Sequence, residues 1–138
     1  MRLKGKEVKT GTGLLVGDIE KMVHFYRDTL GFQTEWDGGD FAAFETAGGG
    51  LSLFMYSRKE FVKAFDENYL PPKGINQTFE LAFWLPNYAA VDAEYERLSK
   101  LDIQFPTGEP MTFTFGIRNF YIVDPEGNLI EIGSTNET

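Results

Sequence analysis

The stretch NFYIVDPEGNLIEI, residues 119–132, decides the fold that we expect for this chain. Its central tetrapeptide, DPEG at 124–127, has Asp, Pro and Gly where a type I turn prefers them. The apolar runs on both sides of the turn predict two strands joined into a hairpin. One carboxylate, Glu131, lies within the second run, where an unpaired charge is costly. Glu131 could therefore be a metal ligand, a catalytic base or a polar residue that faces a wet cleft.

Outward from this stretch, the same order of elements occurs twice. A short apolar strand is followed by an amphipathic helix and then by three strands that glycine-rich or proline-containing turns separate. The predicted strands are at 9–16, 32–38, 40–47 and 51–57 in the first half, and at 78–85, 103–110, 111–124 and 128–134 in the second. We therefore predict an α+β fold with two βαβββ modules in a single domain, 1–138: module 1 at 8–56, a short helix and linker at 57–75, and module 2 at 76–134.

Capping residues predict where the helices begin. Asp18 predicts the helix of the first module, and Asn87 predicts the helix of the second. Ser57 and Glu60 form a capping box that predicts a short helix at 58–67.

Composition excludes several classes of function. The chain has 13 Lys and Arg against 21 Asp and Glu, a net charge of −8, which argues against a nucleic-acid partner and is compatible with a cationic ligand. There is no Cys, which excludes disulfides, thiolate metal sites and a Cys nucleophile. The start lacks the apolar run of a signal peptide, and no stretch approaches the ~20 apolar residues of a membrane span. We expect a soluble cytoplasmic protein with no membrane partner.

Three segments resemble the vicinal oxygen chelate superfamily: VGDIEKMVHFYRDTLGF at 16–32, ELAFWL at 80–85 and DPEGNLIEI at 124–132. This superfamily includes glyoxalase I, extradiol dioxygenases, fosfomycin resistance proteins and the bleomycin resistance protein. The resemblance implies a glyoxalase/bleomycin-resistance/dioxygenase-like fold, in which curved mixed sheets surround a cup. In many members the cup forms between the two chains of a homodimer, so a homodimer is the expected assembly.

The resemblance also implies ligand positions on the first and last strands of each module. Aligning Val16 with Leu85, and Gly48 with Gly127, places these four positions at Gly11, Ser52, Glu80 and Glu131. The family usually has His or Gln, Glu or His, His, and Glu there, so only the last position matches. Gly has no side chain and Ser is a poor ligand for a divalent ion. The single histidine, His24, lies in the first predicted helix.

No metal and no other cofactor is therefore expected. Without histidines near the cup, neither a glyoxalase-type Zn or Ni site nor the two-His iron site of dioxygenases can form. If Mg²⁺ or Mn²⁺ were bound, its ligands would be Glu80 and Glu131.

Strand alternation predicts which side chains face the cup. We expect a small-molecule pocket of aromatic rings and a few convergent polar groups. Its predicted lining is Ser52, Phe54, Tyr56, Glu80, Trp84 and Glu131, with Phe113, Phe115 and Arg118 at the border and Trp36 beside a turn. Arg118 is expected to pair with Glu80 or Glu131, or to meet an anionic ligand. Phe113 and Phe115 could equally lie in a core or a dimer interface. Phe79 is expected in the core.

Three functions remain open on the sequence alone. The first is binding of a small aromatic or cationic molecule in an acidic aromatic cup, as in bleomycin and other antibiotic resistance. The alternative is a metal-dependent lyase or dioxygenase of glyoxalase type that uses Glu131 and Glu80. The third is a metal-free isomerase or lyase with one of these carboxylates as general base, because neighbouring carboxylates raise each other's pKa.

Overall fold

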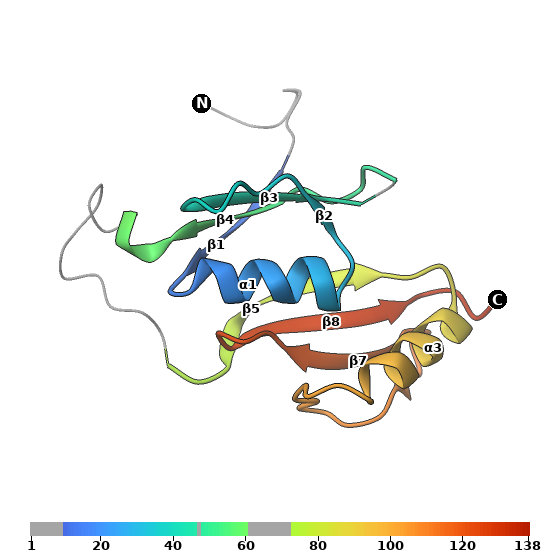
Figure 1. Cartoon of the computed structure of the whole chain (residues 1–138). Coiled ribbons are helices and arrows are strands. Elements are labelled where there is room, and N and C mark those ends of the chain that lie inside the picture. Colours follow the sequence, from blue (N-terminus) through green and yellow to red (C-terminus); the bar gives the residue numbers. More distant parts are fainter. Residues whose placement is uncertain (1–9, 47, 61–72) are drawn as a thin grey trace, which may run out of the picture. The chain divides into compact units, whose positions relative to one another are not determined.

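A computed structural model describes residues 10–46, 48–60 and 73–138 of the chain. These residues divide into two compact units, one before and one after the segment 61–72. Each unit has its own four-stranded sheet and its own helix (Figure 1). None of the helices in the described ranges is long and apolar enough to cross a membrane.

The first unit is a mixed sheet with the strand order β1-β4-β3-β2. Its strands are β1 (Thr12–Val16), β2 (Gln33–Thr34), β3 (Phe41–Glu45) and β4 (Leu53–Ser57), with β1 parallel to β4 and the other pairs antiparallel. The helix α1 (Ile19–His24) continues as a π-helical turn, η1 (Phe25–Thr29), and lies along one face of the sheet (Figure 1). Its buried residues Met22, Val23 and Tyr26 complete the core on that face.

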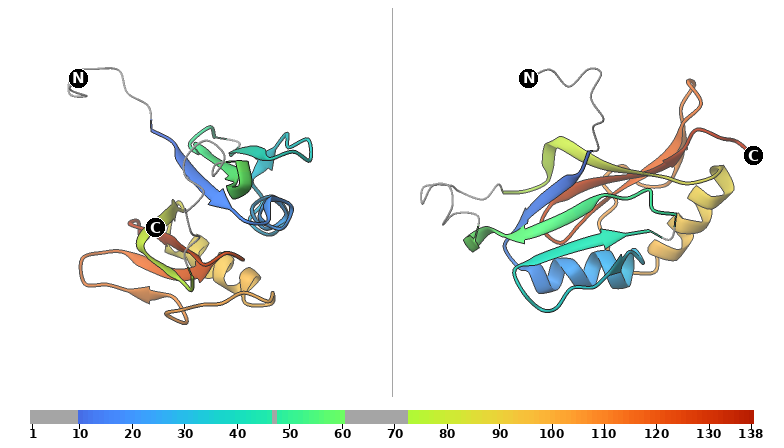
Figure 2. Two further views of the ribbon diagram at one scale, coloured as in Figure 1. Left: turned by 90° about the vertical axis from the view of Figure 1, so that its left-hand side faces the viewer. Right: turned by 90° about the horizontal axis from the view of Figure 1, so that it is seen from above.

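The second unit repeats this topology with the order β5-β8-β7-β6. Its elements are β5 (Asn76–Trp84), α3 (Tyr88–Leu98), β6 (Met111–Thr112), β7 (Arg118–Val123) and β8 (Asn128–Ser134), with β5 parallel to β8. The helix α3 packs against β7 and β8 (Figure 2). The predicted βαβββ order is therefore confirmed in both halves.

Local signals fixed the ends of these elements as expected. The Asp18 carboxylate accepts a hydrogen bond from the Lys21 amide at 3.0 Å, and the Asn87 side chain accepts one from the Ala90 amide at 2.9 Å. In the turn at 124–127, the Gly127 amide donates to the carbonyl oxygen of Asp124 at 3.0 Å. The caps predicted at Asp18 and Asn87 and the turn predicted at 124–127 are thus confirmed.

Three predictions about strands and core were wrong. The single strand predicted at 111–124 is a hairpin of β6 and β7, because Gly116 adopts a φ of +93° and turns the chain back. The segment 103–110 contributes only the isolated bridge between Gln104 and Val123. Phe79 is 51% exposed, since the pairing of β5 with β8 shifts its register between Asn76 and Glu80.

Residues 58–60 are helical, and the rest of the helix predicted at 58–67 lies outside the described residues.

Candidate functional site

The two candidate carboxylates lie on the face of the second sheet that is turned away from α3. Phe120 contacts Tyr95 of α3 with ring centroids 5.4 Å apart, so its face of β7 is the helix-covered one. Side chains alternate along a strand, which places Asn119 and Tyr121 on the opposite face. Ladder pairing then sets Tyr121 beside Glu131.

Glu131 is a buried carboxylate with a specific partner. Both Glu131 and Asn119 are 6% exposed, and Asn119 Nδ2 donates to Glu131 Oε2 at 2.6 Å. Burial of a carboxylate is costly unless hydrogen bonds compensate for the lost water. The Asn119 amide supplies this compensation.

Glu80 lies within hydrogen-bonding reach of both Glu131 and Tyr121. Partial removal of the Glu80 carboxyl from water raises its pKa, and the hydrogen bond and negative charge of Glu131 raise the pKa further, while the Tyr121 hydrogen bond opposes them. Burial and the charges of Glu131 and Glu80 likewise raise the pKa of Tyr121. The cluster can therefore hold a proton on Glu80 at a pH where an ordinary glutamate is ionised.

We expect a pH dependence of stability that disappears in Glu80→Gln. Because the pKa of Glu80 is raised in the folded chain, the folded state binds more protons than the unfolded state between the ordinary glutamate pKa and the raised one. The free energy of unfolding should therefore fall as pH rises through this window and then level off. Urea unfolding from weakly acidic to neutral pH measures this. The exposed control Glu137→Gln should keep the decline, and an unchanged decline in Glu80→Gln would contradict the assignment.

Trp84 is exposed beside this carboxylate cluster. It pairs with Gly133 across the β5–β8 ladder, and its indole covers this glycine so closely that a Cβ there would lie 3.3 Å from Cζ3. The Trp84 side chain is nevertheless 55% exposed. One sheet face thus combines a flat aromatic surface with two carboxyl groups, as the alternation of strand residues predicted.

Arg118 does not take part in this site. Its guanidinium bonds the Asp92 carboxylate on α3 at 2.8 Å and the Thr112 hydroxyl at 2.9 Å. The expectation that Arg118 pairs with Glu80 or Glu131 was wrong, because Arg118 shares the helix-side face of β7 with Phe120. The carboxylate pair therefore keeps its charge uncompensated by this arginine.

The first unit has an aromatic face where the second has carboxylates. In the first unit, Val16 pairs with Ser57. In the second unit, Trp84 pairs with Gly133, so the same register sets the next residues, Leu85 and Ser134, opposite each other. With Val16 equivalent to Leu85, the equivalent of Glu131 is Phe54 and not Ser52. The expected alignment of Ser52 with Glu131 was thus displaced by two residues, because the ladder register makes Gly50, and not Gly48, the counterpart of Gly127.

Phe54 packs directly on Gly13 of β1 and on Gly11, the residue just before this strand. A Cβ added at Gly13 would lie 2.6 Å from Phe54 Cε2, and one at Gly11 would lie 3.1 Å from Cε1. Phe41, which the sequence did not single out, and Tyr56 extend this surface, with ring centroids 4.8 Å apart. The two glycines at the start of the first unit therefore leave space for the Phe54 ring.

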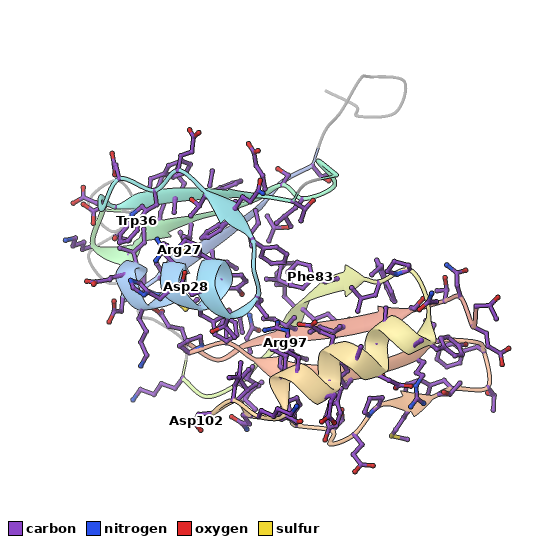
Figure 3. The ribbon with its side chains drawn as sticks, turned by 45° about the vertical axis from the view of Figure 1, so that its right-hand side comes forward. Arg27, Asp28, Trp36, Phe83, Arg97 and Asp102 are labelled. Carbon is purple, nitrogen blue, oxygen red and sulfur yellow. The ribbon has the colours of Figure 1, made fainter. Side chains whose placement is uncertain are left out.

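The remaining sequence candidates lie in two other places. Trp36 lies in the first unit (Figure 3) and donates its indole N–H to the Gly39 carbonyl at 2.9 Å. It lines a depression of about 390 Å³. Phe113 and Phe115 stack on the β6–β7 hairpin with ring centroids 5.3 Å apart. Phe115 is 72% exposed, so it does not lie in a core.

The residues present do not fit a family-type metal site. Within the described ranges, no three His, Cys, Asp or Glu side chains gather closely enough to hold a metal ion. The positions equivalent to the carboxylates hold glycine and Phe54, which offer no donor atom. His24 is exposed on α1 and pairs with Asp28 at 3.2 Å.

Sequence reasoning missed the two residues that organise the carboxylates, Asn119 and Tyr121. Their alternation with Phe120 was visible in the opening stretch. Only the ladder register, which pairs Tyr121 with Glu131 and Asn119 with Gly133, shows that they adjoin the site.

The chain belongs to the glyoxalase/bleomycin resistance protein/dioxygenase superfamily, whose family model matches residues 10–132. The paired βαβββ topology described above agrees with this membership.

Individual relatives are similar to this chain over most of its length. The uncharacterized protein YraH of Bacillus subtilis is 29% identical over 122 residues, covering 86% of this chain and 91% of YraH. A glyoxalase/bleomycin resistance protein/dioxygenase from Nocardioides has a TM-score of 0.76 at 25% identity, covering 98% of this chain and 89% of its own. A lactoylglutathione lyase from Agrobacterium tumefaciens has a TM-score of 0.72 at 26% identity. The match covers 95% of this chain and 96% of the lyase chain.

Proposed function

We propose that the protein binds a small cationic molecule with a flat apolar part on the Trp84 face of its second sheet, and that binding needs no metal. The observation that carries this proposal is the exposed indole of Trp84 beside the Glu80–Glu131 pair. An indole face attracts a cation through its quadrupole and stacks on flat rings. Two carboxyl groups supply the negative charge, and the net charge of −8 adds a favourable long-range field.

The expected result of Trp84→Ala is a loss of about tenfold or more in affinity for such a ligand, because stacking and cation–π contacts are each worth about 1 kcal/mol. Isothermal titration against flat cationic compounds, bleomycin included, measures this in the presence of EDTA. Leu101→Ala is the matched control, since Leu101 is an exposed apolar residue of the same unit outside the site. Absence of binding near micromolar concentrations across the panel would count against the proposal, and so would equal affinities of the two variants.

A second candidate function is proton transfer in a lyase or isomerase reaction. The raised pKa of Glu80 beside the Tyr121 hydroxyl favours this candidate, because a general base works best with a pKa near the operating pH. The similarity to a lactoylglutathione lyase suggests lactoylglutathione as the first substrate to assay. Turnover in EDTA would favour a metal-free mechanism. Turnover only after a divalent metal is added would favour the alternative in which Glu131 and Glu80 are metal ligands, against the donor set seen here.

We also propose a homodimer in the cytoplasm. The exposed, stacked Phe113 and Phe115 on the β6–β7 hairpin support an apolar contact with a second copy. Light scattering of the purified protein measures its mass, and a monomer at all concentrations would remove the dimer from the proposal.

A further inference from the structure

Met111 of β6 is a large apolar side chain that is 54% exposed. It pairs with Asn119 in the β6–β7 ladder, and the next pair is Thr112 with Arg118. The Thr112 hydroxyl accepts a hydrogen bond from Arg118, whose guanidinium also bonds Asp92 of α3. Thr112 therefore points to the helix side of the sheet. Alternation along β6 turns Met111 to the opposite face, which carries the carboxyl groups.

One row of the ladder crosses all four strands of this face. It contains, from β5 to β6, Trp84, Gly133, Asn119 and Met111. A Cβ at Gly133 would lie 3.0 Å from the Cβ of Asn119 and 3.3 Å from Cζ3 of Trp84, so these two side chains close over the glycine from both sides. Neighbouring strands lie about 4.8 Å apart, so the row is roughly 14 Å long, with an indole at one end and a thioether at the other.

Met111 differs from Met22 and Met55, the other methionines in the described ranges, because both of those are fully buried. A single exposed apolar residue is ordinary on a protein surface. Met111, however, shares its row with the exposed indole of Trp84. Two exposed apolar side chains on one row of the site face indicate a contact surface for a ligand.

The carboxyl groups lie to one side of this row. Glu131 precedes Gly133 by two residues on β8, so it is on the same face, one step of about 7 Å along the strand. The indole over Gly133 is therefore the nearer apolar group to Glu131. Met111 lies two strands further across the sheet, roughly 12 Å from Glu131 by the standard strand spacings.

Hydrogen bonds hold the hairpin that carries Met111. The Phe113 amide donates to the Ile117 carbonyl at 2.8 Å and closes the hairpin. The Tyr88 hydroxyl of α3 donates to the Gly116 carbonyl at the turn at 2.7 Å. A side chain on a fixed strand loses less freedom when a ligand binds, so Met111 is a preorganised contact.

We propose that Met111 is a specificity-determining residue that selects an elongated aromatic cation, with its ammonium group at the carboxyl groups, one ring on Trp84 and a second ring on Met111. The inference rests on the proposed function, because it names the class of cation that the site takes. The negative carboxyl groups determine which end of the ligand carries the charge. A ligand with one ring reaches the indole, and only a second ring reaches Met111, whose polarisable sulfur contacts ring edges favourably.

The test compares benzylammonium, which has one ring, with 4-phenylbenzylammonium, which has two, by isothermal titration in EDTA. The two-ring amine should bind the wild type about tenfold more tightly, because its second ring buries apolar surface against Met111. Met111→Ala should remove most of this preference and change the affinity for benzylammonium by less than about twofold. Met111→Leu keeps the apolar volume and should retain most of the preference.

Leu101→Ala is the matched control. Leu101 is 44% exposed in the same unit and lies outside the site, so this variant should keep the wild-type preference. Three results overturn the role of Met111: equal affinities of the wild type for the two amines, an unchanged preference in Met111→Ala, and equal losses of both amines in that variant.

The failure of this inference is distinguishable from the failure of the proposed function. If benzylammonium binds and Trp84→Ala weakens it, but the second ring adds nothing, the proposed function stands and the role of Met111 is overturned. If the neutral 4-phenylbenzyl alcohol binds as tightly as the two-ring amine and Met111→Ala weakens it, the cation is overturned and the selection of length by Met111 stands. Absence of binding by all three compounds overturns both.

Discussion

Phe120→Ala should lower the free energy of unfolding by about 3–5 kcal/mol, the usual cost of emptying a buried phenylalanine site. Phe120 is fully buried at 0% exposure, and its ring contacts Tyr95 at 5.4 Å and Phe105 at 6.1 Å between centroids. The cavity would lie between α3 and the sheet, where the neighbouring rings of Tyr95 and Phe105 cannot move enough to fill it. Urea unfolding followed by circular dichroism measures the loss.

Phe79→Ala is the matched control because it makes the same chemical change in the same unit. Phe79 lies on β5 and is 51% exposed, so the free energy of unfolding should change by at most about 1 kcal/mol. A small effect at Phe120, or comparable effects at both positions, would contradict the assignment of Phe120 to the core.

Gly127→Ala should cost about 2–4 kcal/mol, from backbone strain and steric overlap together. Gly127 adopts a φ of +88°, and an added Cβ would overlap the carbonyl oxygen of Gly74. The Gly127 carbonyl also accepts a hydrogen bond from the Asn76 amide at 2.7 Å, so the turn cannot move away without losing the start of β5. Thermal and urea unfolding both report this loss.

Gly116→Ala separates the cost of backbone strain from the cost of steric overlap. Gly116 has a similar φ of +93°, but nothing lies within 4 Å of its would-be Cβ. We expect only the strain contribution there, about 1–2 kcal/mol. Equal losses in the free energy of unfolding for Gly127→Ala and Gly116→Ala would mean that the overlap with the Gly74 carbonyl adds no cost at Gly127.

Most of the fold could be read from local sequence. The caps at Asp18 and Asn87, the turn at 124–127 and the repeated order of elements depend on residues a few positions apart. The hairpin of β6 and β7 was missed because Gly116 within an aromatic run gives only a weak turn signal next to strong strand propensity.

The site could be predicted only in part. Alternation alone placed Glu80, Trp84 and Glu131 on one face, because side chains on a strand point to opposite faces in turn. The partners Asn119 and Tyr121 required the register of β7 on β8. Register also corrected the comparison between the halves, since it makes Phe54 the counterpart of Glu131.

The sequence by itself determined the family, the module order and the position of Glu131 in an apolar strand. The tertiary structure decided which side chains surround Glu131. Hydrogen-bonding between strands brings together residues that are distant along the chain, so the amide of Asn119 and the carboxyl of Glu80 meet Glu131, and the indole of Trp84 covers Gly133 on the same face, only in the folded sheet. The Asn119 hydrogen bond lowers the cost of burying this carboxylate, and no local pattern in the chain encodes that contact.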